Sequence, residues 1–184
     1  IELDNSTIPS NYSAVDGDIL LSVNFSDDRE INDSSDIKGP FFDCKPIEYT
    51  QDDFTYSAQQ LITFFSEHPV NTLVLINPDN PSGYYMGQSE LATLLQWCKE
   101  ENKNLIVDES FLDFADEENV SLLSESILNE NPNLYVVKSI SKSYGVPGLR
   151  LGILASGNAD MIGCLKKSVS IWNINSMAEF FMQI

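Results

Sequence analysis

Blocks of apolar residues alternate along this chain with stretches in which apolar residues recur every three or four positions. The continuous apolar runs are typical of strands buried on both faces, as in a parallel sheet covered by helices. The periodic stretches predict helices with one buried face. This alternation predicts an α/β fold with a largely parallel sheet. The predicted strands are 72–76, 104–107, 134–137 and 149–155, and the predicted helices are 56–67, 89–102, 122–129, 158–170 and one that begins at Ser176.

Two of the helices allow finer predictions. Ser89 is expected to be the N-cap of the helix over 89–102, because a serine side chain accepts a hydrogen bond from the first free amides of a helix. In the helix over 158–170, we expect Met161, Ile162 and Leu165 to face inward.

The first 38 residues give the weakest pattern. Residues 19–25 are compatible with a strand, but the acidic and Asn/Ser-rich segments around them are typical of solvated turns. We therefore treat 1–38 as an N-terminal segment of unclear role and place the folded domain at 39–184. Within that domain, residues 41–49 predict an edge strand, because Pro46 removes a ladder N–H.

Three polar clusters each follow a predicted strand. Asn77–Gly83 comes after the first strand, Asp108–Phe111 after the second and Ser139–Lys142 after the third. Ligands of parallel sheets bind at the carboxyl ends of the strands. The three clusters therefore predict one shared site.

Lys142 is the candidate with the most distinctive chemistry. A lysine placed at the end of a buried strand can become a nucleophilic amine suited to Schiff-base formation. Ser139 and Ser141 offer hydroxyl groups beside it, and Arg150 offers a planar fork that suits phosphate. These groups suggest a cofactor with an aldehyde and a phosphate. The alternative is a polar loop with an exposed lysine.

Asp108 and Asn80 add two more candidates. Asp108 ends an apolar strand, so its carboxylate needs a partner such as a protonated pyridine nitrogen. Asn80 lies between two prolines, and its amide is placed to donate to a phenolate oxygen. The alternatives are a strand-end aspartate that caps the next turn and a turn-forming asparagine.

Charge and cysteine usage narrow the function classes. The formal net charge of −18 leaves no basic face for nucleic acid. The three cysteines are widely spaced and His68 is the single histidine, so we expect no metal site and a reduced, cytoplasmic setting. No apolar run reaches the roughly 18 to 20 residues that a membrane-spanning helix needs, so we expect no membrane association.

The three clusters together resemble the motifs of class I and II aminotransferases, which are pyridoxal-phosphate enzymes of fold type I. The motifs are Asn77-Pro-Asp-Asn-Pro-Ser-Gly83, Asp108-Glu-Ser-Phe111 and Ser139-Ile-Ser-Lys142 with Arg150. Within that family, the chain is most similar to histidinol-phosphate aminotransferase and threonine-phosphate decarboxylase. The resemblance implies the large cofactor-binding domain of such an enzyme, a three-layer α/β/α structure that is incomplete here.

The resemblance also implies a role for each candidate residue. Lys142 would form a Schiff base with pyridoxal 5′-phosphate and later move the proton at the substrate Cα. Asp108 would pair with the pyridine nitrogen, and Asn80 would donate to the ring hydroxyl oxygen. The phosphate would be held by Ser139, Ser141 and Arg150.

Departures from the family pattern leave the reaction open. Phe111 stands where many aminotransferases have a tyrosine that reaches the ring oxygen, and the segment Asp108–Phe114 is more similar to the decarboxylase branch. Residues 1–38 do not match the Gly-rich phosphate cup, and the chain stops near Asn175, before the small C-terminal domain. We therefore expect a fragment of a longer enzyme.

Three functions follow from these observations. The first is transamination between an amino acid and a keto acid, both small-molecule substrates, by an enzyme that the resemblance implies to be a homodimer. The second is decarboxylation of a phosphorylated amino acid. The third is a non-catalytic fragment that binds the cofactor weakly or not at all.

Overall fold

The computed structural model describes residues 54–117, 121–169 and 173–183. Two predictions lie outside the described residues. They are the strands over 19–25 and 41–49 and the boundary between 1–38 and 39–184.

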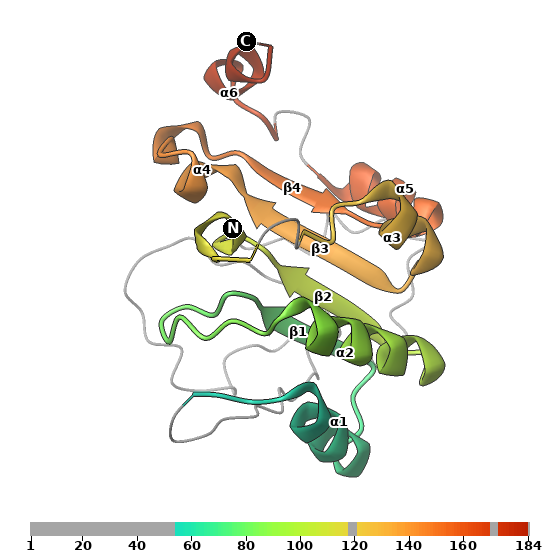
Figure 1. The fold of residues 1–184 in the computed structure, drawn as a ribbon. Coiled ribbons are helices and arrows are strands. Elements are labelled where there is room, and N and C mark those ends of the chain that lie inside the picture. The colour runs from blue at the N-terminus through green and yellow to red at the C-terminus, as the bar shows by residue number, and fades with distance from the viewer. Residues whose placement is uncertain (1–53, 118–120, 170–172, 184) are drawn as a thin grey trace, which may run out of the picture. The chain divides into compact units, whose positions relative to one another are not determined.

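Four strands form one mixed sheet in the order β1-β2-β3-β4 (Figure 1). The first two neighbouring pairs are parallel, and β4 runs antiparallel to β3. The prediction of a mostly parallel sheet in an α/β fold is therefore confirmed. The strands are β1 (Thr72–Ile76), β2 (Asn104–Asp108), β3 (Leu134–Ser139) and β4 (Gly152–Ala155).

The helices follow the predicted order. They are α1 (Ala58–Glu67), α2 (Gln88–Glu100), α3 (Glu125–Glu130), α4 (Ile140–Ser143), α5 (Ala159–Ser168) and α6 (Ser176–Phe181). The start of α1 is fixed by a reciprocal capping box between Ser57 and Gln60. Single 3₁₀ turns are present at Leu112–Phe114 and Pro147–Leu149. None of the described helices has both the length and the apolar character needed to cross a membrane.

The core lies on one face of the sheet. Alternate residues of the three parallel strands point to this face and are buried against the apolar sides of α1 and α2, together with Leu122. The strand residues are Leu73, Leu75, Leu105, Val107, Leu134 and Val136. In Figure 1, α2 lies in front of β1, and α1 lies below it.

The prediction that the run over 72–76 is buried on both faces is wrong. Val74 and Ile76 are 45% and 39% exposed, while Leu73 and Leu75 of the same strand are buried. This run predicted burial correctly for one face only, because β-propensity and burial both favour the same residue types.

Three local predictions also need correction. The N-cap of α2 is Gly87 rather than Ser89, and no side chain caps that helix. Met161 and Leu165 of α5 do not face inward, since they are 43% and 37% exposed. The segment expected as a plain loop after β3 contains the one-turn helix α4, which carries Lys142.

Candidate active site

The three polar clusters meet at one edge of the sheet. The Asn77 amide donates to the Asp108 carbonyl oxygen over 2.9 Å, and the Glu109 amide donates to the Val137 carbonyl oxygen over 2.8 Å. These bonds continue the parallel pairing past the ends of β1 and β2. The prediction that the strand ends converge is therefore confirmed.

Asn77 shapes the loop after β1. Its buried side chain donates to the Met86 carbonyl oxygen over 3.0 Å and accepts from the Met86 amide over 2.8 Å. This pair of bonds closes the loop at its base in the way that a β-bridge would. Gly83 adopts a φ of 75°, which a glycine tolerates without strain, and its amide donates to the Asp79 carbonyl oxygen. Asn80 is exposed at the tip of this loop.

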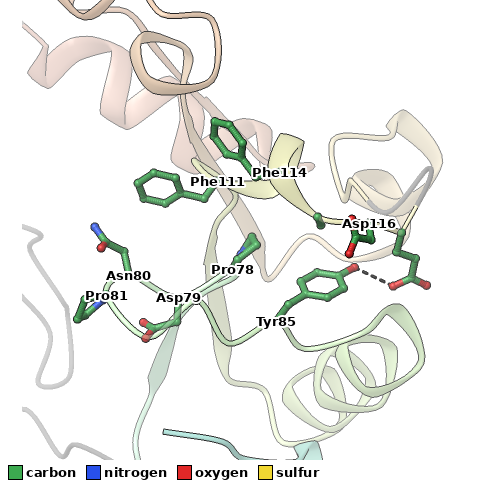
Figure 2. A pocket seen from close by; sticks show the side chains of 11 residues that line it. Pro78, Asp79, Asn80, Pro81, Tyr85, Phe111, Phe114 and Asp116 are labelled. Carbon is green, nitrogen blue, oxygen red and sulfur yellow. Dashed lines mark hydrogen bonds between the residues drawn. The ribbon is translucent and has the colours of Figure 1, made fainter.

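A pocket of about 530 Å³ lies between this loop and the segment after β2. Figure 2 shows Asp79, Asn80 and Pro81 on the loop side, and Phe111 and Phe114 on the other side. Tyr85 lies at the base, and its hydroxyl donates to Glu117 over 2.9 Å. Burial, followed by this bond, raises the pKa of Tyr85 to about 12.

Lys142 is exposed on α4, and its ammonium nitrogen lies 4.5 Å from the centroid of the Phe111 ring. At this distance a cation is attracted to the face of an aromatic ring. The lysine therefore comes from the third strand end and rests on a ring that also lines the pocket.

Asp108 is half-buried at the end of β2. Its Oδ1 accepts a hydrogen bond from the Ser110 amide over 2.8 Å, which fixes the orientation of the carboxylate. The other oxygen has no hydrogen bond recorded within the described part of the chain. An oriented carboxylate with remaining acceptor capacity can receive a proton donor such as a pyridinium N–H.

The three predicted phosphate ligands lie in different surroundings. Ser139 is half-buried, and its amide donates to Ser110 Oγ over 3.0 Å. Ser141 is buried, accepts from the Leu151 amide over 3.3 Å and contacts the Leu151 carbonyl oxygen at 3.5 Å. Arg150 is exposed, with a left-handed φ of 53° just after a 3₁₀ turn. None of these three lines the pocket.

A buried polar cluster beside the lysine turn was not predicted from the sequence. The Lys138 ammonium lies 2.8 Å from both carboxylate oxygens of Asp113. Glu109 is 1% exposed and accepts from Ser121 Oγ over 2.6 Å and from the Leu122 amide over 2.7 Å. Lys138 follows the apolar run over 134–137 directly, and this position was the signal that a buried partner was needed.

The pKa values of the two carboxylates in this cluster are shifted in opposite directions. The hydrogen bond from Lys138 lowers the pKa of Asp113. Burial raises the pKa of Glu109, and its bonds to Ser121 and Leu122 offset only part of that effect.

Comparisons with known proteins agree with this arrangement. A decarboxylase structure from Sulfurospirillum multivorans superposes with a TM-score of 0.61 at 34% identity, covering 72% of this chain and 37% of that one. The fold is thus that of the fold type I pyridoxal-phosphate enzymes. The model of the family Aminotransferase class I and II matches residues 35–181, and the chain belongs to that family.

Two curated relatives differ in their reactions. The L-serine phosphate decarboxylase of Sulfurospirillum multivorans is 35% identical over 73% of this chain and 34% of its own length. A histidinol-phosphate aminotransferase of Bacteroides fragilis is 32% identical over 74% of this chain and 38% of its own length. The chain spans about a third of the length of these relatives.

The family and its solved members identify the cofactor. One structural neighbour, the histidinol-phosphate aminotransferase of Sinorhizobium meliloti, is in complex with pyridoxal 5′-phosphate, and the cofactor of this family is pyridoxal 5′-phosphate. The residues described above fit it chemically. An exposed amine, an oriented carboxylate and an exposed amide come from three adjacent strand ends.

Proposed function

We propose that this chain forms part of the pyridoxal-phosphate site of an enzyme that decarboxylates a phosphorylated amino acid. The observation that carries the proposal is the position of Lys142, whose ammonium nitrogen lies 4.5 Å from the Phe111 ring at the edge of the pocket. A phenylalanine at that position has no hydroxyl group to offer a cofactor oxygen, and the serine-phosphate decarboxylase relative favours this reaction.

In this proposal, Lys142 holds the cofactor covalently through its amine. Asp108 accepts a hydrogen bond from the ring N–H and keeps that nitrogen protonated, and the Ser110 amide already orients the carboxylate. Asn80 donates from its amide to the ring hydroxyl oxygen. When bound, the cofactor supplies an electron-accepting ring that takes up the electron pair released at the substrate α-carbon.

The phosphate of the cofactor is assigned to Ser139, Ser141 and Arg150. The Ser141 hydroxyl must turn from Leu151 to donate to a phosphate oxygen. That change costs little, because its contact with the Leu151 carbonyl oxygen is 3.5 Å long, at the limit of a hydrogen bond.

Loss of the carboxylate as carbon dioxide would leave the α-carbon in need of a proton, and Lys142 is the residue that would deliver it from its ammonium group. In the structure this ammonium group lies against the Phe111 ring, which also lines the pocket.

Transamination is the second candidate, favoured by the histidinol-phosphate aminotransferase relative. In this case Lys142 would instead remove a proton from the α-carbon, so that the amino acid would leave as a keto acid and its amino group would pass to a second keto acid. In either case we propose a homodimer acting in the cytoplasm on small-molecule substrates.

One assay separates the two candidates. The protein is incubated with pyridoxal phosphate and O-phospho-L-serine, O-phospho-L-threonine or histidinol phosphate, with 2-oxoglutarate present or absent. Release of carbon dioxide from a carboxyl-labelled phosphoamino acid, independent of 2-oxoglutarate, supports decarboxylation. Formation of glutamate supports transamination. A protein that does neither and takes up no cofactor is the third, non-catalytic case.

A further inference from the structure

Ser110 lies between the two groups on which the proposed chemistry depends. It is buried, and it follows Asp108 in the turn after β2. Its amide donates to Asp108 Oδ1 over 2.8 Å, so the orientation of that carboxylate depends on the backbone at Ser110.

The same residue also contacts the lysine turn at both of its ends. Ser110 Oγ accepts from the Ser139 amide over 3.0 Å, and the Ser110 carbonyl oxygen accepts from Ser143 Oγ over 3.0 Å. Ser139 lies three positions before Lys142 and Ser143 lies one position after it. The next residue, Phe111, carries the ring that contacts the Lys142 ammonium.

We propose that Ser110 is a positioning residue that fixes Lys142 relative to Asp108. This inference rests on the proposed function for its catalytic meaning, but its structural part is independent. In a site that needs an amine and a carboxylate on opposite parts of one ring, errors of about 1 Å reduce the rate strongly. A single buried residue bonded to both elements limits such errors.

The role predicts a specific effect of Ser110→Ala. Removing Oγ leaves the half-buried Ser139 amide without its acceptor, which destabilises the lysine turn. We expect the amides of Ser139–Tyr144 to exchange hydrogen faster by roughly five- to tenfold, the factor that corresponds to one lost hydrogen bond. In Ser110→Ala, the borohydride-reduced adduct of pyridoxal phosphate with Lys142 should form more slowly than in the parent protein, by a similar factor.

Ser121→Ala is the matched control. It also removes a serine hydroxyl from a hydrogen bond, the 2.6 Å bond to Glu109, but it does not touch the lysine turn. We expect it to lower the unfolding temperature at least as much as Ser110→Ala while leaving exchange at Ser139–Tyr144 unchanged. Ser143→Ala removes the second bond and should speed exchange of the same amides, and Ser110→Thr, which retains the hydroxyl, should restore slow exchange.

The outcomes separate this inference from the proposed function. Unchanged exchange at Ser139–Tyr144 in both Ser110→Ala and Ser143→Ala overturns the positioning role. The positioning role is also overturned if the same amides exchange faster in Ser121→Ala, because the effect is then a general loss of stability. If exchange responds as predicted but the parent protein takes no pyridoxal phosphate at Lys142, the positioning of the turn stands and the proposed function fails.

Discussion

The ion pair between Lys138 and Asp113 allows a quantitative test of the buried cluster. The ammonium lies 2.8 Å from the carboxylate, and the two side chains are 10% and 40% exposed. Coulomb's law at this distance gives roughly 6 kcal/mol for a dielectric constant of 20 and roughly 1.5 kcal/mol for that of water. Because Asp113 is partly exposed to solvent, the interaction energy is lower than the upper figure. Because Lys138 is buried, it is higher than the value in water.

Replacing Asp113 with Asn removes the charge but retains the shape and one acceptor. Lys138 is then left buried beside the more distant Glu109. We expect the free energy of unfolding to fall by about 2 kcal/mol, between the values for exposed and fully buried pairs. Urea unfolding followed by circular dichroism measures the change, with an unchanged m-value. The control is Asp116→Asn, at an exposed acid in the same segment.

A second variant tests the reason for the loss. In Lys138→Met combined with Asp113→Asn, no charge of the pair remains buried, so most of the stability should return. The reasoning is refuted if Asp113→Asn costs no more than Asp116→Asn, since the pair then behaves like an ordinary surface pair. It is also refuted if the double variant is less stable than Asp113→Asn.

Two further predictions concern Glu109 and the glycines Gly157 and Gly163. Because burial raises the pKa of Glu109, the folded protein holds that proton more tightly than the unfolded chain, and the free energy of unfolding should fall as the pH rises through the raised pKa. Glu109→Gln should remove this fall in urea titrations across pH, and a parallel fall in the variant would contradict the assignment. A Cβ added to Gly157 would lie 2.1 Å from the Leu128 carbonyl oxygen, so Gly157→Ala should lower stability by about 1 to 3 kcal/mol. Gly163→Ala, where a Cβ meets nothing within 4 Å in α5, should raise it by up to about 1 kcal/mol, and equal effects of the two changes on the unfolding temperature would be inconsistent with this packing.

The sheet could be predicted because each described strand contains a short apolar run. The run over 72–76 coincides with β1, and the run over 104–107 lacks only Asp108 of β2. Exposure of the second face could not be predicted, because Val and Ile favour strands whether or not anything covers them. The N-cap of α2 was misplaced because Gly87 begins the helix without a side-chain bond, so no cap residue identifies its start.

The sequence predicted which strand ends carry the candidate residues, but not the contacts between them. The order of the motifs placed Asn80, Asp108 and Lys142 on adjacent loops, because neighbouring parallel strands end at the same edge of a sheet. The bonds of Ser110 to Ser139 and Ser143 are long-range contacts that no local pattern encodes. The pairing of Lys138 with Asp113 was likewise hidden, because a charge in a strand reveals the need for a partner but not its position.

The most direct test of the central claim is the site at which pyridoxal phosphate attaches. The protein is mixed with the cofactor and reduced with borohydride, and the modified peptide is identified by mass spectrometry. We expect one modified residue, Lys142, and loss of both the label and the cofactor absorbance in Lys142→Ala. A label on Lys138 or another lysine, or equal labelling of the parent and the Lys142→Ala variant, would contradict it.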